Sequence, residues 1–414
     1  MGVEMILRAK YLVCDARKNI SDGAVKISGR KISRTGKFAS LHQDPGETII
    51  DFGEAAIAPG FINAHTHLQF RKALPYNGNF ADWLRQAKQA GKSRSPEESA
   101  NAMRRSLDEA VCAGTTTIAS TGIPADCPVR GLDFVEIICL DENNAEKKAA
   151  ELKERLAQIE AAGNTACIAP HAPFTVVKSL LEHCANLAQK ENRLLSIHAA
   201  ESTMETTFLL GHRGELFEML KAAGAPLDDW EPPRTTPIKY LAQAGIPGRR
   251  TLLAHCNYLT SEEVDIISHS GTSVVYCPRS SAYFGHKDHP FMRLIERGIN
   301  VALGTDSLAN SETLCLLDEV RFLARRFPKT PPSAFWSLAT AGGAAALGLK
   351  NKTGRLKKGF SADIAVLDLT GCDGKNVFDK ITAENSRIAA VFSEGKPVYD
   401  ANGLISETQG HNNA

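Results

Sequence analysis

The stretch PGFINAHTH, residues 59–67, is the part of the sequence that decides the fold. It is a short apolar run that ends in two histidines, and such a run is typical of a parallel strand buried on both faces. His65 and His67 are separated by one residue, so on a strand both imidazoles project from the same face. The stretch therefore predicts a core strand whose carboxyl end carries two converging nitrogen donors.

Further apolar runs follow this strand, and helix-like or longer segments separate them. The runs are TTTIAS (115–120), DFVEIICL (133–140), ACIAPHA (166–172), LLSIHAA (194–200), TLLAHCN (251–257), TSVVYCP (272–278) and NVALGTD (300–306). Residues 96–114 and 144–163 are among the segments between them that look helical. Eight strand candidates that alternate with helices predict an α/β fold, a (β/α)8 TIM barrel over residues 59–355.

The two ends of the chain have a different pattern. MILRAKYLVCD (5–15) near the start and DIAVLDL (363–369) near the end are strand-like and lack helical periodicity. Chain termini often lie close together in space. We therefore expect one small β-sandwich domain built from both ends, residues 1–58 plus 356–405, around the inserted barrel.

The composition indicates a folded protein that acts on a small molecule. Of the 414 residues, 43% are hydrophobic and 23% are charged, as in globular proteins. The 48 basic and 47 acidic side chains nearly cancel, which gives no electrostatic footprint for nucleic acid or an anionic membrane. No stretch approaches the roughly 20 apolar residues of a membrane helix, and the charged N-terminal run is not a secretion signal.

The cysteines indicate a reducing compartment. All ten are scattered singly and none forms a CxxC pair. With no export signal, we interpret them as reduced thiols of a cytoplasmic protein. The zinc-deaminase pattern of HxE followed by PCxxC is absent, so any deaminase chemistry must use another scaffold.

Four ligand-type side chains stand at the carboxyl ends of predicted strands, where this fold places its active site. His65 and His67 end the first strand, His198 ends the fifth and Asp306 ends the eighth. Three imidazoles and a carboxylate suit one divalent cation, expected to be Zn²⁺, although Fe²⁺ and Mn²⁺ accept similar ligands. A lone HxH pair is also explained by surface or core histidines, but the joint placement of four residues favours a metal site.

Other polar residues at the same strand ends are candidates for proton transfer and substrate binding. Glu201 is positioned to shuttle a proton, and a glutamate favoured by a helix N-terminus is the alternative. Asp306 would accept a proton from a water whose pKa the metal lowers towards ~7. His255 would then stabilise the attacking hydroxide, or it is a core histidine. His171 would face the same cavity, where it contacts substrate or has a structural role.

PGFINAHTH, SIHAAES, LLAHCN and LGTDSLAN, in this order and at these intervals, resemble the motifs of the amidohydrolase superfamily. More narrowly, they resemble its deaminase and chlorohydrolase branch, and the resemblance covers nearly the whole chain. It implies that the four ligand residues named above hold a single metal, that Glu201 shuttles protons and that His255 positions the water. The fourth strand offers His171 and no bridging lysine, so the resemblance implies one metal and a substrate contact for His171.

Within this branch, HTHLQF, NFADWL, HAAESTMETTFL and CPRSSAYFGH are most similar to aminodeoxyfutalosine deaminases of menaquinone biosynthesis. The resemblance implies removal of the 6-amino group of 6-amino-6-deoxyfutalosine or a related adenine nucleoside, with release of ammonia. Ser281 stands where many relatives have asparagine, which disfavours S-adenosylhomocysteine and triazine substrates. On this interpretation Arg279 would pair with the substrate carboxylate, with a rim salt bridge as the alternative. Trp83 and Phe70 would stack on the purine, with core packing as the alternative.

Other functions on the same scaffold remain as alternatives, because a fold does not fix its substrate. Guanine or pterin deaminases and triazine-type chlorohydrolases are the enzymatic ones. A non-enzymatic barrel is the alternative from another class, but it would lack a metal ligand or Glu201, and all are present. The sequence does not determine the metal identity in the cell, the loop that closes the site or the oligomeric state. A homodimer is compatible with it.

Overall fold

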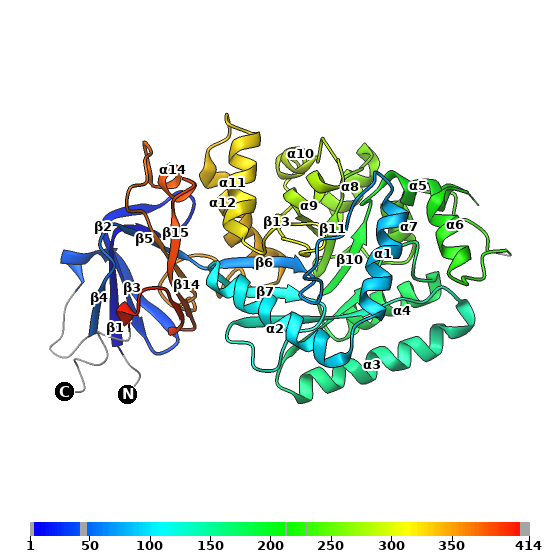
Figure 1. Ribbon diagram of the computed structural model, residues 1–414, viewed down its shortest axis with the longest axis horizontal. Helices are drawn as coiled ribbons and strands as arrows, with labels where there is room; N and C mark the ends of the chain where they lie inside the picture. The colour runs from blue at the N-terminus through cyan, green and yellow to red at the C-terminus, as the bar shows by residue number, and fades with distance from the viewer. Residues whose placement is uncertain (1–3, 42–47, 212, 229, 406–414) are drawn as a thin grey trace.

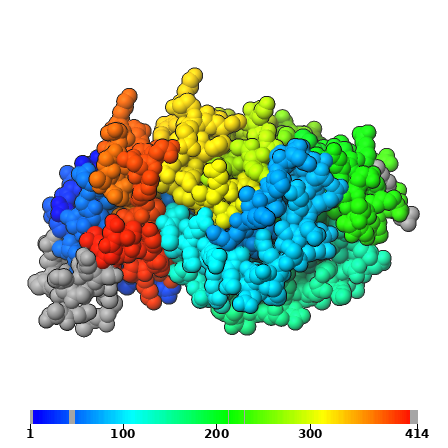
Figure 2. Space-filling view, in the orientation of Figure 1, coloured from blue at the N-terminus to red at the C-terminus, as the bar shows by residue number. Residues whose placement is uncertain are grey.

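The chain folds into two lobes that lie side by side (Figure 1). The structure is a computed structural model and describes residues 4–41, 48–211, 213–228 and 230–405. The larger lobe is a barrel of strands and helices, and the smaller lobe contains strands from both the first and the last part of the chain. In the space-filling view the smaller lobe abuts barrel segments coloured cyan and yellow (Figure 2).

Parallel strands form the barrel wall in chain order, from β6 to β13. They are β6 (Phe61–Thr66), β7 (Thr115–Ser120), β8 (Arg130–Ile137), β9 (Thr165–Pro170), β10 (Leu195–Ala199), β11 (Thr251–His255), β12 (Ser273–Tyr276) and β13 (Val301–Leu303). A parallel bridge between Thr66 and Asp306 joins the first strand to the segment that follows the last. All eight predicted strands are present, and the predicted (β/α)8 barrel is confirmed.

Helices cover the outside of this wall. They are α1 (Phe80–Lys92), α2 (Pro96–Cys112), α3 (Ala145–Ala161), α4 (Lys178–Lys190), α5 (Thr203–Leu210), α6 (Glu215–Ala222), α7 (Pro237–Gln243), α8 (Ser261–Ser270), α9 (Pro278–Tyr283), α10 (Phe291–Glu296), α11 (Leu316–Arg326), α12 (Pro332–Ser337) and α13 (Gly343–Ala346). The 3-10 helix η2 (Glu142–Asn144) directly precedes α3, and the π-helical segment η3 (Leu338–Gly342) joins α12 to α13. None of the helices that the structure describes is both long enough and apolar enough to cross a membrane.

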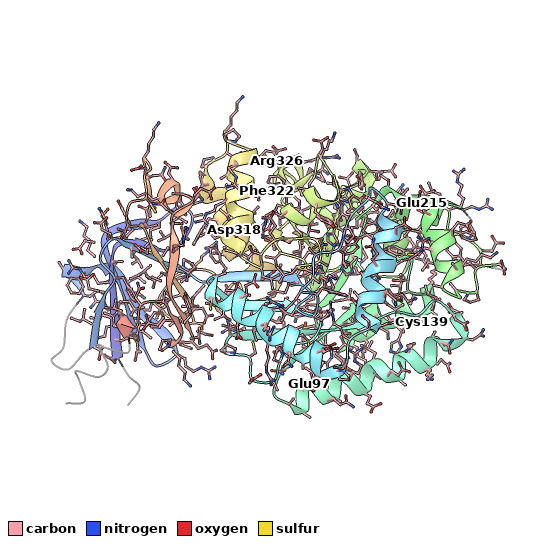
Figure 3. The ribbon with its side chains drawn as sticks, viewed as in Figure 1. Glu97, Cys139, Glu215, Asp318, Phe322 and Arg326 are labelled. Carbon is pink, nitrogen blue, oxygen red and sulfur yellow. The ribbon has the colours of Figure 1, made fainter. Side chains whose placement is uncertain are left out.

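Helix α2 illustrates why these segments are helical. Ser95 and Glu98 form a capping box that satisfies the free N–H groups at its start. Leu107 belongs to the face that the helix buries, whereas Glu97 lies exposed at the outer surface. Glu215 at the start of α6 is exposed in the same way (Figure 3). In an amphipathic helix such as α2 the apolar stripe packs on the barrel, and the charged face meets water.

The smaller lobe is one hydrogen-bonded sheet made from both ends of the chain. Its strand order is β16-β15-β14-β5-β1-β2-β3, and β4 pairs with β1 off this path. The elements are β1 (Glu4–Val13), β2 (Asn19–Ser28), β3 (Lys31–Lys37), η1 (Phe38–Ser40), β4 (Thr48–Asp51), β5 (Ala55–Pro59), β14 (Ile364–Asp368), α14 (Val377–Ile381), β15 (Arg387–Ser393) and β16 (Lys396–Asp400). The antiparallel pairing of β5 with β14 joins the two ends, so the predicted composite β domain is present.

The barrel is oriented by its contact with this domain. Gly60 is the single residue between β5 of the small sheet and β6 of the barrel. Arg130 at the start of β8 pairs with Asp363, which immediately precedes β14. The amino ends of β6 and β8 therefore face the β domain. Apolar side chains such as Phe134 and Leu252 fill the barrel below the carboxyl ends of its strands.

Candidate active site

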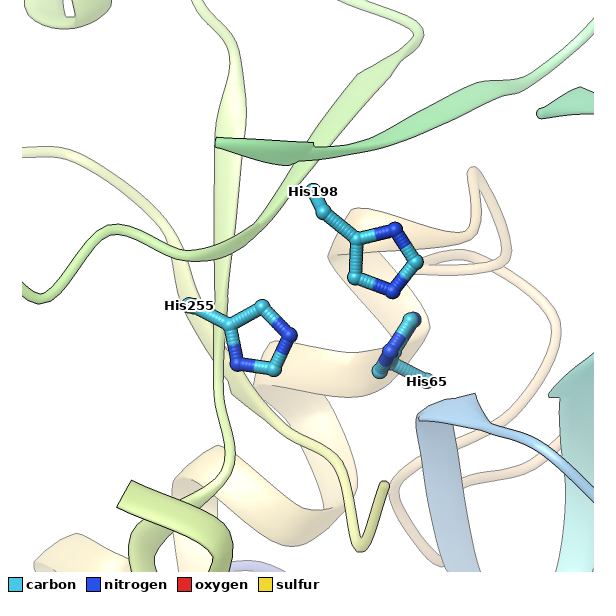
Figure 4. A group of neighbouring side chains, drawn as sticks. All are labelled: His65, His198 and His255. Carbon is cyan, nitrogen blue, oxygen red and sulfur yellow. The ribbon is translucent and has the colours of Figure 1, made fainter. Parts of the chain in front are cut away.

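The carboxyl ends of four barrel strands bring the predicted ligand residues to one point. His65 and His67 lie at the end of β6, His198 on β10, His255 on β11, and Asp306 just after β13. Donor atoms of His65, His67 and Asp306 lie within 4.8 Å of one another, and so do those of His65, His198 and His255. Figure 4 shows the three rings of the second group gathered around a common centre.

The Nε2 atoms of two of these rings lie close together. Nε2 of His67 lies 3.2 Å from Nε2 of His198 and 4.0 Å from Oδ1 of Asp306. Nδ1 of His198 donates to the carbonyl of His171 at 2.7 Å, so its Nε2 carries the lone pair. Nδ1 of His67 lies 3.2 Å from Oγ1 of Thr121. Ring nitrogens held this close repel each other unless a cation or a proton lies between them.

At this centre, Nε2 of His65 and Nε2 of His255 are buried and have no hydrogen-bond partner in the part of the chain that the structure describes. A buried polar atom without a partner costs about 1–3 kcal/mol. Burial lowers the pKa of His65 well below its usual value, and it lowers the pKa of His198 and of His255 to about 3 each. Neutral imidazoles are the form that binds metals, so this donor set fits a divalent cation.

The backbone is unusual at the same strand ends. The φ angle is +73° at His255, +56° at Asp306 and +50° at Ala200, in the left-handed region that side-chain-bearing residues rarely adopt. Such residues cost about 1–3 kcal/mol each and cluster at functional sites. Gly304 lies so close to His65 that a Cβ there would be 2.7 Å from the His65 carbonyl oxygen, so glycine allows the two segments to meet.

The two carboxylate oxygens of Asp306 have different surroundings. Oδ2 accepts hydrogen bonds from Oγ of Ser280 and Nδ2 of Asn310, both at 2.8 Å. Oδ1 remains on the side of the imidazoles. Burial alone would raise the pKa of Asp306, but His255, His67 and these two hydrogen bonds lower it overall. The residue therefore offers a negatively charged oxygen to the centre.

Glu201 lies next to this centre, in the turn between β10 and α5. Its Oε1 is 3.7 Å from Nε2 of His255, and its carboxylate, His255 and Asp306 form a third group of donors within 4.8 Å. Burial raises the pKa of Glu201 well above its usual value, and the charges of Asp306 and Glu205 add to this. A carboxyl group with a raised pKa can both carry and release a proton near neutral pH.

Two predicted substrate contacts, His171 and Phe70, lie beside the ligand residues. The His171 ring centre is 4.9 Å from that of His198, and both residues line one cavity inside the barrel mouth. Nδ1 of His171 is 2.8 Å from Oγ1 of Thr175, and burial lowers its pKa to about 4. The Phe70 ring meets His67 edge-on, with centres 6.3 Å apart. Both positions suit contact with a ring bound at the centre.

Trp83, the other predicted aromatic contact, packs within a cluster on α1 and its neighbours. It is 8% exposed, stacks with Phe80 and meets Phe284 edge-on at 4.9 Å between ring centres. These contacts match the core packing that was the alternative for Trp83. Its stacking on a substrate purine therefore gains no support from the geometry.

Arg279, for which the sequence offered a substrate carboxylate or a rim salt bridge as partner, pairs with Glu319 in the structure. Its Nε donates to Oε1 of Glu319 at 2.8 Å, and one Nη donates to the carbonyl of Thr313 at 2.7 Å. Thr313 in turn donates to Asp318, labelled on α11 in Figure 3, at 2.9 Å. The Glu319 side chain is fully buried and needs a cation, so Arg279 takes the salt-bridge alternative.

Two polar residues near the site escaped the sequence analysis. Glu136, near the end of β8, lines the same cavity as His171. The position of this acidic residue inside the apolar run DFVEIICL is the sequence feature that could have indicated it. Arg94 lies with its guanidinium carbon 5.5 Å from the centre of the Phe70 ring and donates to the Gln69 carbonyl. It takes part in none of the ion pairs found among the described residues, and no local pattern marks it.

Comparison with known proteins gives a family and several relatives. Residues 56–398 match the model of the Amidohydrolase family. The chain is 28% identical over 403 residues to a 5-methylthioadenosine/S-adenosylhomocysteine deaminase of Nitratidesulfovibrio vulgaris, and the match covers 91% of this chain and 86% of that protein. It is 27% identical over 391 residues to a 5′-deoxyadenosine deaminase of Methanothermobacter thermautotrophicus, with coverage of 89% and 86%.

Solved structures share the fold. The aminofutalosine deaminase of Helicobacter pylori, in complex with methylthio-coformycin, superposes with a TM-score of 0.82 at 22% identity, over 95% of this chain and 100% of that one. An adenosine deaminase from Xanthomonas campestris with bound zinc gives a TM-score of 0.78 at 22% identity, over 99% and 98%. At this level of identity the superpositions show the fold alone.

Proposed function

The chain belongs to the amidohydrolase family, and we propose that it removes the 6-amino group of an adenine nucleoside and releases ammonia. The family and its deaminase relatives make it a hydrolase of C–N bonds in cyclic amidines. The proposal is carried by one observation: buried ring nitrogens without a partner, on His65 and His255, lie in groups of close donor atoms that also include the carboxylates of Asp306 and Glu201. A cation site and a proton-carrying carboxyl group together suit water attack on an amidine carbon.

The donor set fits one divalent cation, and zinc is the expected ion. His65, His67, His198 and Asp306 would hold it, because their donor atoms converge and two of the ring nitrogens face each other at 3.2 Å. A bound divalent cation lowers the pKa of its water to about 7 and so supplies hydroxide at neutral pH. Ser280 and Asn310 would keep Asp306 oriented toward the ion.

Glu201 would carry the first proton. Its carboxylate takes a proton from the attacking water and delivers it to N1 of the purine, while the oxygen adds to C6. Nε2 of His255 lies 3.7 Å from Oε1 of Glu201. It would hold the attacking water oxygen by a hydrogen bond. Asp306 would take the hydroxyl proton of the adduct and pass it to the departing amine. The balance is one water consumed, one C–N bond broken, and one ring carbonyl and one ammonia formed.

The purine would lie between His171 and Phe70. Nε2 of His171 is free to meet a ring heteroatom, since its Nδ1 is engaged with Thr175. Phe70 covers the approach to His67. Our preferred substrate is 6-amino-6-deoxyfutalosine, on the motif resemblance, which would make this a cytoplasmic enzyme of menaquinone biosynthesis. The cysteines are free thiols, as a reducing compartment requires.

An ammonia-release assay on zinc-loaded protein tests the proposal. The substrates are 6-amino-6-deoxyfutalosine, 5′-methylthioadenosine, S-adenosylhomocysteine and 5′-deoxyadenosine, with guanine, a pterin and a chlorinated triazine as the alternatives. We expect turnover of adenine nucleosides and the highest kcat/KM with the first compound. Ammonia from guanine or the pterin alone, or chloride release alone, would overturn the assignment, and no turnover of any compound would favour a non-enzymatic barrel.

A further inference from the structure

The backbone of Glu201 is held from both sides. Its N–H donates to Oε2 of Glu205 at 3.1 Å, and its carbonyl accepts a hydrogen bond from Nδ2 of Asn257 at 2.9 Å. Oδ1 of Asn257 in turn accepts from Oγ of Ser281 at 3.1 Å. All four side chains are buried, so these hydrogen bonds do not compete with bulk water.

The hydrogen bonds fix a turn that the chain would not adopt by itself. Ala200, directly before Glu201, has a φ of +50°, and strain of this kind persists only where the surroundings over-determine it. The N–H of Tyr258 donates to the Ala200 carbonyl at 3.2 Å, so the loops after β10 and β11 run together. This turn carries the Glu201 carboxyl group to 3.7 Å from His255. A small rotation of the peptide would move it out of reach.

The two ends of the Asn257 amide have different partners, which sets its orientation. The Ser281 hydroxyl donates to the amide oxygen, and the amide NH₂ therefore faces the Glu201 carbonyl. The described hydrogen bonds of Asn257 reach no predicted metal ligand, and its effect on the site passes through Glu201.

We propose that Asn257, oriented by Ser281, is a positioning residue that aligns Glu201 for proton transfer. The inference rests on the proposed function, in which Glu201 moves the first proton. It also gives Ser281 a physical meaning at the position where the family resemblance leads one to expect asparagine. The Ser281 hydroxyl orients the Asn257 amide on the neighbouring loop.

The chain contains a matched pair at the other end of the barrel. Nδ2 of Asn300 donates to Oγ of Ser273 and to the carbonyl of Gly342, both at 3.1 Å. Ser273 begins β12, and Asn300 directly precedes β13. Asn300→Ala therefore removes an asparagine with similar partners and leaves the candidate site untouched, which makes it the control for Asn257→Ala.

The first test measures structure and needs no activity. Hydrogen exchange is followed by mass spectrometry on the full-length, zinc-loaded protein, over the segment 199–205. We expect Asn257→Ala to speed exchange in this segment and Asn300→Ala to leave it unchanged, because only Asn257 contacts the turn. Zinc content measured in parallel is expected to stay equal in both variants.

The second test separates alignment from binding, with 5′-methylthioadenosine as the substrate. We expect Asn257→Ala to lower kcat by about 10- to 100-fold and to leave KM within about twofold, because misplacement of a catalytic group by ~1 Å has an effect of this size. Ser281→Ala should show the same split with a smaller loss. Ser281→Thr keeps the hydroxyl and should restore much of kcat. If Asn257→Ala does not fold, the two serine variants decide.

The outcomes distinguish this inference from the proposed function. A wild type that deaminates no adenine nucleoside overturns the proposed function and the role in proton transfer with it. An active wild type whose Asn257→Ala variant matches Asn300→Ala in both exchange and kcat overturns this inference alone. So does an Asn257→Ala variant that loses its zinc, because the residue would then support the metal site.

Discussion

Two clusters of buried polar side chains at opposite ends of the barrel differ in whether their polar atoms have partners. Next to the β domain, Arg130 pairs with Oδ2 of Asp363 at 2.8 Å and with Oε1 of Glu394 at 3.1 Å. Asp363 is 2% exposed, and its other carboxylate oxygen accepts from the N–H of Glu394 at 2.9 Å. At the opposite end, Nε2 of His65 and Nε2 of His255 are just as buried and have no partner.

The difference distinguishes residues that stabilise the fold from residues that the fold positions for the candidate site. A buried ion pair whose hydrogen bonds are satisfied joins the two lobes at little net cost. Unpartnered nitrogens at the other end destabilise the chain, and under the proposed function they persist because a metal ion and a reaction use them. Changes at the carboxyl-end rim should therefore alter metal binding and turnover, whereas changes at the lobe junction should alter stability.

Of the changes that test this difference, removal of the metal should have the largest effect on turnover and stability. Dialysis against a chelator is expected to abolish ammonia release and to lower Tm, because the converging nitrogens lose the ion that compensates their burial. Adding back one equivalent of Zn²⁺ should restore both. The measurement is metal content, Tm and kcat on the same samples, and full activity at zero metal would contradict the site.

Glu201→Gln should have the next largest effect. The amide keeps the size of the side chain but cannot carry the proton, so kcat should fall by about 10²- to 10⁴-fold. Metal content should not change, and Tm should not fall, because the variant removes a buried carboxyl group whose pKa burial has raised. Near-normal turnover in this variant would show that another group moves the proton.

The sequence predicted the barrel and the residues at its rim because each left a local signal. A short apolar run that ends in a histidine is visible without any neighbour, as at His65 and His198, and the strands appear where the runs predict them. The composite β domain left a similar signal at both chain ends. The catalytic and ligand roles of these residues, and the exact domain limits, remain predictions.

The open alternatives and omissions concern contacts between residues far apart in the chain. The sequence left Arg279 open between a substrate carboxylate and a rim salt bridge, because its partner, Glu319, stands 40 residues away on another helix and carries no local sign of the pairing. Asn257 was not noticed because its contact with Glu201 spans 56 residues and passes between two loops. Partners of this kind are fixed by the tertiary fold, so a pattern read along one segment cannot contain them.

Arg130→Met tests the lobe junction. The variant leaves Asp363 buried beside Glu394 without its cation, so we expect a loss of about 3–5 kcal/mol in the free energy of unfolding. Denaturant unfolding measures this, and kcat of the folded protein should stay within about twofold of wild type. Arg8→Met is the control, because its exposed pairs with Asp22 and Asp51 are screened by solvent and should contribute little to stability. Equal losses of unfolding free energy in both variants would contradict the structural role assigned to the buried pair at the lobe junction.

The smallest expected effect separates the two arginines near the rim. Arg279 is neutralised by Glu319, whereas Arg94 lies against Phe70 without an acidic partner among the described ion pairs. If the substrate carries a carboxylate, as 6-amino-6-deoxyfutalosine does, Arg94→Met should raise its KM by about tenfold, which corresponds to roughly 1.4 kcal/mol. The KM of the uncharged 5′-methylthioadenosine should stay unchanged, because no charge is lost from its contacts.

Arg279→Met should give the reverse pattern. It leaves the buried Glu319 unpaired, so Tm should fall, while the ratio of the two KM values should stay at the wild-type value. A change of that ratio in Arg279→Met but not in Arg94→Met would return the substrate carboxylate to Arg279. It would also show that Arg279, which pairs with Glu319 in the free protein, binds the substrate instead. The distinction between supporting and functional residues would then fail at this position.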